Sequence, residues 1–161
     1  MKPIRNILLL ALAISLFPLS SFAQDCVDYH EVGDCMLDRQ KGFKTYSQSK
    51  SVRISPLDTV ELNIVFYGQK DYILSFCTHK KLYPVHFVLM DTETRQVLYD
   101  NAEDKFIESL GLGFDITRSL VLKIAVLSRG SSEEEIKDVI GCVGLLIQYK
   151  NYEKKKVNLQ M

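Results

Sequence analysis

Residues 58–77, DTVELNIVFYGQKDYILSFC, decide the fold class. Their first half alternates apolar with polar residues at a period of two, which predicts a half-buried strand over 60–66. Gly68–Asp71 reads as a turn. The second half repeats the alternation, so a second strand is expected over 72–78, with Tyr72, Leu74 and Phe76 on one face. Two such strands in succession indicate an antiparallel sheet.

The same period continues along the chain. Strands are expected at 43–54, 85–90, 95–99, 120–126 and 142–149, and the segment after Asp100 reads as a loop or helical turn followed by a strand that ends near Thr117. One short helix is expected over 133–139. Seven to eight short strands with almost no helix predict an all-β chain, folded as an antiparallel, jelly-roll-like β-sandwich.

The first 23 residues differ in kind from the rest. Lys2 and Arg5 precede an apolar run over 7–17, and small residues before Gln24 form a cleavage site, which together predict a secretory signal peptide over 1–23. The alternative is an uncleaved N-terminal anchor. The run has 11 residues, and a membrane span needs about 20. We therefore expect an exported protein, periplasmic or at the cell surface, with no transmembrane span after cleavage.

Length and charge exclude several classes of protein. The chain has 161 residues, with 20 basic and 20 acidic side chains. Removal of Lys2 and Arg5 with the signal leaves 18 basic and 20 acidic side chains, a net charge of −2. Such a chain has no broad basic field for nucleic acid. We divide the rest into an N-terminal disulfide-containing loop over 24–42, one sandwich domain over 43–150 and a basic tail over 151–161.

All four cysteines follow the predicted signal: Cys26, Cys35, Cys77 and Cys142. An exported destination permits disulfides, and four cysteines allow three pairings. We favour Cys26–Cys35, which closes a short loop, and Cys77–Cys142, which joins two strands if these are neighbours in one sheet. The alternative is that one or both pairs stay reduced as small apolar residues.

The segments "DTVELNIVFYGQKDYILSFC", "PVHFVLMDTETRQVLYDN", "FDITRSLVLKIAVLS" and "GCVGLLIQYK" resemble, in strand order and spacing, the pre-peptidase C-terminal domain of secreted bacterial enzymes. The runs "GFKTYSQSKS" and "GCVGLLIQYK" are also similar to short exported proteins of Gram-negative bacteria that have no assigned activity. The resemblance implies a stand-alone sandwich without a known site. Any accessory role would then be carried out on a separate molecule.

Catalytic and metal-binding patterns are weak. His30 lies among acidic residues, yet their spacing differs from that of a calcium loop. His79 reads as part of an exposed basic turn, and His86 reads as a half-buried strand residue. The chain contains no Gly-x-Ser-x-Gly motif. We therefore expect no enzyme, no cofactor and no metal, with a small hydrolase as a distant alternative.

Tyrosines are the main candidates for binding. Tyr46, Tyr67, Tyr83 and Tyr99 lie at or near predicted strand ends, and aromatic side chains are enriched at interaction surfaces. The alternative is that each ring is buried at the margin of the core. We expect a non-catalytic module for an envelope or secreted protein. A carbohydrate-binding module is the alternative, and it would need two or three coplanar tyrosines.

Overall fold

The computed structural model describes residues 26–31, 39–56, 58–127 and 141–152. Two 3-10 turns, η1 (Tyr29–Glu31) and η3 (Lys80–Leu82), accompany the strands. The strands are β1 (Lys44–Thr45), β2 (Lys50–Ile54), β3 (Thr59–Phe66), β4 (Lys70–Thr78), β5 (Val85–Asp91), β6 (Val97–Asp100), β7 (Ser109–Phe114), β8 (Arg118–Val126) and β9 (Gly141–Asn151).

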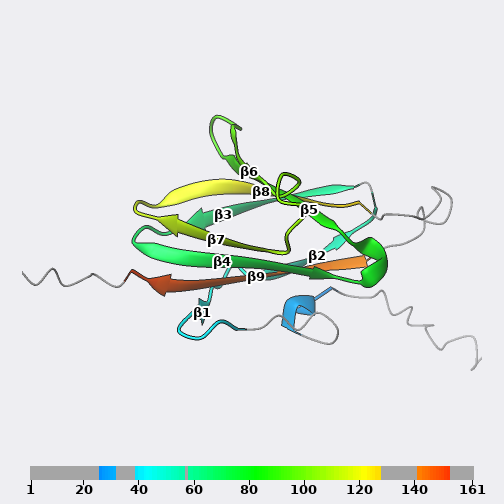
Figure 1. The fold of residues 1–161 in the computed structure, drawn as a ribbon, viewed down its shortest axis with the longest axis horizontal. Coiled ribbons are helices and arrows are strands. Elements are labelled where there is room, and N and C mark those ends of the chain that lie inside the picture. Colours follow the sequence, from blue (N-terminus) through cyan, green and yellow to red (C-terminus); the bar gives the residue numbers. More distant parts are fainter. Residues whose placement is uncertain (1–25, 32–38, 57, 128–140, 153–161) are drawn as a thin grey trace, which may run out of the picture.

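These strands form two antiparallel sheets that pack face to face (Figure 1). One sheet has the order β1-β9-β4-β7, with β2 also paired to β9, and the other has the order β3-β8-β5-β6. The predicted all-β sandwich is therefore confirmed. The described residues contain nine strands, because the predicted strand over 43–54 is divided into β1 and β2, which both pair with β9.

The period-two pattern places one face of each strand in the core. Along β3, Ile64 and Phe66 are fully buried, while Glu61 and Asn63 face outwards. The whole of β3 pairs in register with β8, from Thr59 opposite Ala125 to Phe66 opposite Arg118. Burial of apolar area contributes about 25 cal/mol for each Å², so a one-residue slip that exposed these side chains would be strongly disfavoured.

The predictions for β6 and β7 each need a correction of length. The returning strand of the hairpin starts at Val97 rather than Arg95, because Asp91 accepts hydrogen bonds from Glu93 and Thr94 in the turn. The strand after the loop ends at Phe114 rather than near Thr117, because Arg118 already pairs with β3.

The outer face of β9 is covered by the N-terminal segment. Leu146 and Gln148 point away from the core, yet 2% and 0% of their surfaces are exposed. The backbone N–H of Gln40 donates to Oε1 of Gln148 (2.8 Å), and η1 lies against the same strand. This cover explains why β9 is buried on both faces although it belongs to a two-layer sandwich.

The predicted disulfide pairing is wrong. Cys26 is bonded to Cys142 (Cα–Cα 5.4 Å), so neither Cys26–Cys35 nor Cys77–Cys142 can form. This bond anchors the N-terminal segment to the start of β9.

The register of β4 and β9 gives the reason. The two strands are neighbours, as expected, but Cys77 lies opposite Gly144. Cys142 is therefore a diagonal neighbour, and Cα atoms at such positions are roughly 7–8 Å apart, farther than disulfides usually span. Cys77 is itself disulfide-bonded, and Cys35 lies outside the described residues.

Other predictions also lie outside the described residues. These are the signal peptide over 1–23, the helix over 133–139 and most of the basic tail over 151–161. Within the part of the chain that is described, no helix is long and apolar enough to cross a membrane.

Candidate functional site at the paired-loop tip

The four candidate tyrosines occupy different environments. Tyr46 is 7% exposed and belongs to the core, whereas Tyr67 is 51% exposed at the end of β3. Their rings are in contact, with centroids 6.3 Å apart. Tyr83 is half-buried beside Thr78, and Tyr99 donates its hydroxyl hydrogen to Asp104 (2.7 Å). The structure thus brings Tyr46 and Tyr67 together and leaves the other two elsewhere.

Tyr46 and Tyr67 belong to an aromatic cluster at one end of the sandwich. Neighbouring ring centroids in this cluster are 5.0–6.3 Å apart, and most of the rings meet edge to face. Its members are Tyr46, Phe66, Tyr67, Tyr72, Phe114 and Tyr149. Lys70 lies over the ring of Tyr149 at 4.6 Å, where its charge contacts the electron-rich face. The cluster gives the exposed Tyr67 a rigid base.

Hydrogen bonds fix the backbone of Tyr67. Its N–H donates to the hydroxyl of Tyr72 (2.8 Å), and that hydroxyl donates to the carbonyl of Tyr67 (3.2 Å). Before this point, the Tyr46 hydroxyl donates to the carbonyl of Val65, and the Val65 N–H donates to Gln48 (3.2 Å). The backbone that presents the Tyr67 ring is therefore held by side chains from separate segments.

Buried phenols serve these bonds as neutral donors. Burial, followed by the neighbouring Tyr72 and Tyr67, raises the pKa of Tyr46 from its ordinary value of 10.0 to about 12. Burial also raises the pKa of Tyr72, although its hydrogen bond to the Tyr67 backbone acts in the opposite direction. Both hydroxyls thus keep their hydrogens at neutral pH.

A second loop packs against the first, and we call residues 67–69 together with 115–117 the paired-loop tip. Gly68 donates its backbone N–H to Oγ1 of Thr117 (3.1 Å), and the side-chain Nε2 of Gln69 donates to the backbone carbonyl of Asp115 (2.9 Å). A Cβ on Gly68 would lie 2.7 Å from the Asp115 oxygen and 2.8 Å from the Ile116 Cα, so only glycine allows this approach.

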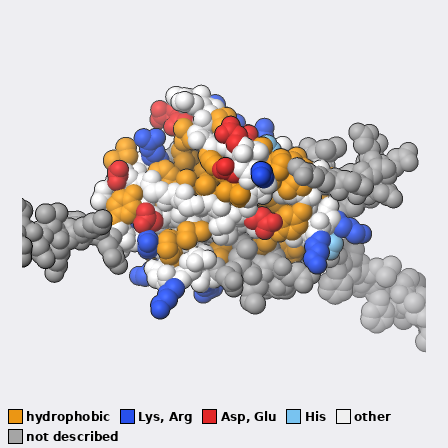
Figure 2. Space-filling view, in the orientation of Figure 1, with side chains coloured by type: hydrophobic (Ala, Val, Ile, Leu, Met, Phe, Trp, Pro, Cys, Tyr) orange, Lys and Arg blue, Asp and Glu red, His pale blue; other side chains and the backbone are white. Residues whose placement is uncertain are grey.

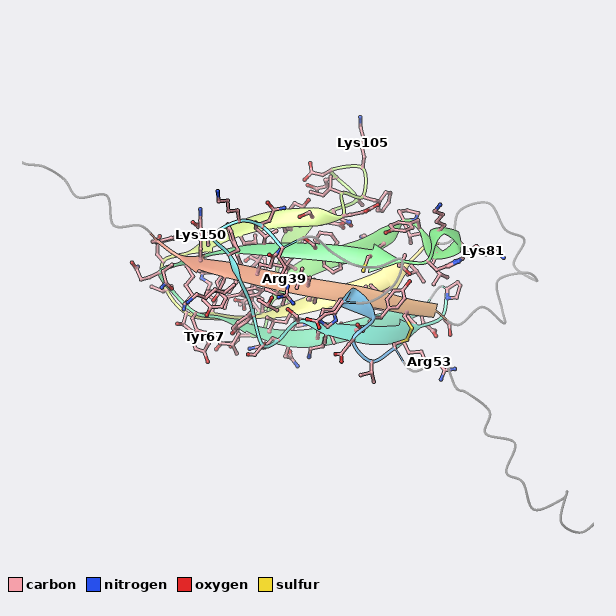
Figure 3. All side chains as sticks on the ribbon, turned by 90° about the horizontal axis from the view of Figure 1, so that it is seen from below. Arg39, Arg53, Tyr67, Lys81, Lys105 and Lys150 are labelled. Atoms are coloured by element: carbon pink, nitrogen blue, oxygen red, sulfur yellow. A yellow bond between two sulfur atoms is a disulfide. The ribbon has the colours of Figure 1, made fainter. Side chains whose placement is uncertain are left out.

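The paired-loop tip exposes two large apolar side chains. Tyr67 is 51% exposed and Ile116 is 64% exposed. Figure 3 shows Tyr67 at the periphery, near the end of the sandwich where β3 stops. Because the loops are joined by hydrogen bonds and close packing, the backbone that carries these side chains is held before binding, which lowers the cost of ordering it.

The histidines take structural positions. His30 is buried and its N–H and Nδ1 both contact Oγ of Ser51 (3.1 and 3.0 Å). The side chain of His79 accepts from the N–H of Lys81 at the start of η3. Nε2 of His86 lies 2.8 Å from Asp100, and although burial opposes ionisation of Asp100, bonds from Ala102 and His86 lower its pKa. Among the described residues, no group of three potential metal ligands is assembled.

Sequence reasoning missed Ile116 and the closeness of the two loops. Ile116 fitted the period-two pattern of a buried strand, while it in fact lies beyond the end of β7. The Gly68 turn was recognised, but its contact with Asp115 joins residues 47 positions apart. The pattern of residues along the sequence gives no indication of a contact between two positions so far apart.

No protein-family model matches the chain, and no curated protein matches it. Among solved structures, the chain is similar to a periplasmic inhibitor of g-type lysozyme from Aeromonas hydrophila. The TM-score is 0.45 and the identity is 8%, over 71% of this chain and 93% of that chain. Similarity at this level identifies neither a partner nor an activity.

Proposed function

We propose that this chain is an exported, non-catalytic module that binds an envelope or secreted protein through the paired-loop tip. The observation that carries the proposal is the exposure of Tyr67 and Ile116 on two loops held together by hydrogen bonds. Tyrosine is enriched among residues that dominate binding energy. The disulfide-bonded Cys26, Cys77 and Cys142 support an exported location.

The geometry of Tyr67 favours a protein over a glycan. Its ring meets that of Tyr46 at an interplanar angle of 84°, so the two rings do not extend one flat surface on which a sugar could stack. A pocket on a protein surface can instead enclose a single projecting aromatic ring. The resemblance to the pre-peptidase C-terminal domain stays a prediction.

Site-specific photocrosslinking in the native envelope tests the proposal. A photoreactive phenylalanine analogue at position 67 or 116 is expected to give the same discrete protein adduct. Position 97 is the matched control, because Val97 is a 54%-exposed apolar residue outside the paired-loop tip. Tyr67→Ala should then weaken binding of the identified partner by at least roughly tenfold, the range of a binding hot spot. Equal adducts at 67 and 97, or unchanged affinity, would refute the proposal.

A further inference from the structure

The edge strand β7 differs from the other edges of the two sheets. Native edge strands are protected from pairing with other chains by charge, proline or bulges. The edge strands β1, β2, β3 and β6 each contain at least one charged residue. The sequence of β7, SLGLGF, contains neither a charge nor a proline, and it pairs with β4 without a bulge.

Among the strands that the structure describes, β7 pairs only with β4, and its other edge carries an orderly row of backbone groups. The Phe76 N–H donates to the Glu108 carbonyl (2.8 Å) next to the registered pairs of β4 and β7. Because hydrogen-bonded residues alternate in an antiparallel pair, Leu110, Leu112 and Phe114 bond to β4. The other residues of β7 direct their N–H and C=O groups away from β4, and they are Ser109, Gly111 and Gly113.

Small side chains leave this edge accessible to another backbone. Ser109, Gly111 and Gly113 are exposed residues of β7. A Cβ on Gly111 would meet nothing within 4 Å, whereas a Cβ on Gly113 would lie 2.9 Å from the Tyr152 hydroxyl, so the face of the sheet is open at Gly111 and covered at Gly113. Figure 2 shows a white band where β7 runs, bordered by apolar side chains; white marks the backbone and side chains that are neither apolar nor charged. Glycine inside a strand commonly marks a place where another backbone approaches closely.

We propose that β7 pairs with β7 of a second copy of this chain, antiparallel about a twofold axis at Gly111. Gly111 then lies opposite Gly111 of the second copy, and Ser109 lies opposite Gly113 of the second copy. Ser109, Gly111 and Gly113 each form a hydrogen-bonded pair with a residue of the second copy. Each of these three pairs has two backbone hydrogen bonds, so six new bonds form. Such a contact is isologous and closed, which is the commonest symmetry of protein dimers.

Charge and shape agree with this register. The paired strands carry no charge, so no like charges meet across the axis. Glu108 would lie opposite Phe114 of the second copy. Phe114 pairs with Lys70 on β4, so the residue next to Phe114 on the adjacent strand has a charge of opposite sign to that of Glu108. Lys105 projects beyond the strands in Figure 3, and its loop over 101–107 directly precedes the Ser109 end of β7. The axis therefore places the two loops at opposite ends of the paired strands.

Sedimentation velocity over a range of protein concentrations tests the dimer. Gly111→Pro removes an N–H that is not bonded to β4, so the fold should be kept while two central hydrogen bonds are lost. Its dimer dissociation constant should rise at least roughly 30-fold. Gly111→Ala keeps the N–H and is the matched control, which should dimerise like the wild type. Equal thermal unfolding of both variants verifies the fold.

Cysteine crosslinking tests the register. Opposed residues of a hydrogen-bonded pair have Cα atoms about 5.5 Å apart, within disulfide range. Gly111→Cys should therefore give a covalent dimer on mild oxidation. Ser109→Cys should not, because the two copies of position 109 would be roughly 13 Å apart along the strands.

Three results would overturn the proposal: a wild-type monomer at every concentration, a Gly111→Pro variant that dimerises as the wild type does, or equal crosslinking at positions 109 and 111. Tyr67→Ala should leave dimerisation unchanged, so this test is independent of the proposed partner site.

Discussion

The disulfide between Cys26 and Cys142 encloses most of the sandwich, and its removal should be costly. The two cysteines are 116 residues apart. For a loop of that length, the loss of chain entropy in the unfolded state corresponds to about 5 kcal/mol at 25 °C. Domains of ordinary stability unfold with roughly 5–15 kcal/mol. The double variant Cys26→Ala/Cys142→Ala should therefore lose a large share of its free energy of unfolding.

Guanidinium unfolding of the wild type and the double variant measures this loss. Without the crosslink, the unfolded chain can expand further, so the dependence of unfolding free energy on denaturant (the m-value) should increase. That increase separates an effect on the unfolded chain from a simple loss of packing at Cys26. A decrease of less than about 1 kcal/mol, the size of an ordinary substitution, with an unchanged m-value would refute the reasoning.

Three further predictions concern buried polar groups. The pKa of Tyr46 is about 12 in the folded state and 10.0 ordinarily. Its contribution to the free energy of unfolding is therefore fully present below pH 10 and is lost as pH rises through 12. Tyr46→Phe should remove this pH dependence of the unfolding free energy between pH 10 and 12. The Asn101 side chain bonds the backbone of Phe87, Val85 and Ile107 at 2.9–3.1 Å; Asn101→Ala should cost about 3 kcal/mol in urea unfolding, and Asn101→Asp, which lacks the two donors, should not restore it. Gln148→Leu leaves the Gln40 N–H without its acceptor and should cost about 1 kcal/mol, with faster hydrogen exchange at Gln40; unchanged exchange would contradict this role.

The strands were predictable because their signal is local. Residues 60–66 and 72–78 show their buried face within a few positions, and β3 and β4 cover both ranges. The lengths at strand ends were less predictable. Ile116 continues the alternation of β7, but pairing of Arg118 with Phe66 requires a turn there.

The candidate site was predictable only in part. Tyr67 was identified as an aromatic residue at a strand end, and it is exposed. Tyr46 was identified by the same argument, yet it is buried, since its ring contacts Tyr67, Tyr72 and Tyr149 from three other segments. No pattern within the neighbourhood of Tyr46 in the chain reports those contacts.

The sequence by itself determined the all-β class and the approximate place of each described strand, because alternation at a period of two is written residue by residue. The tertiary structure alone decided the register between strands. The register of β4 with β9 places Gly144 rather than Cys142 opposite Cys77. The register of β4 with β7 directs the backbone N–H and C=O of Gly111 away from β4. Contacts between distant segments depend on how whole strands align, and one residue of shift would change every one of them.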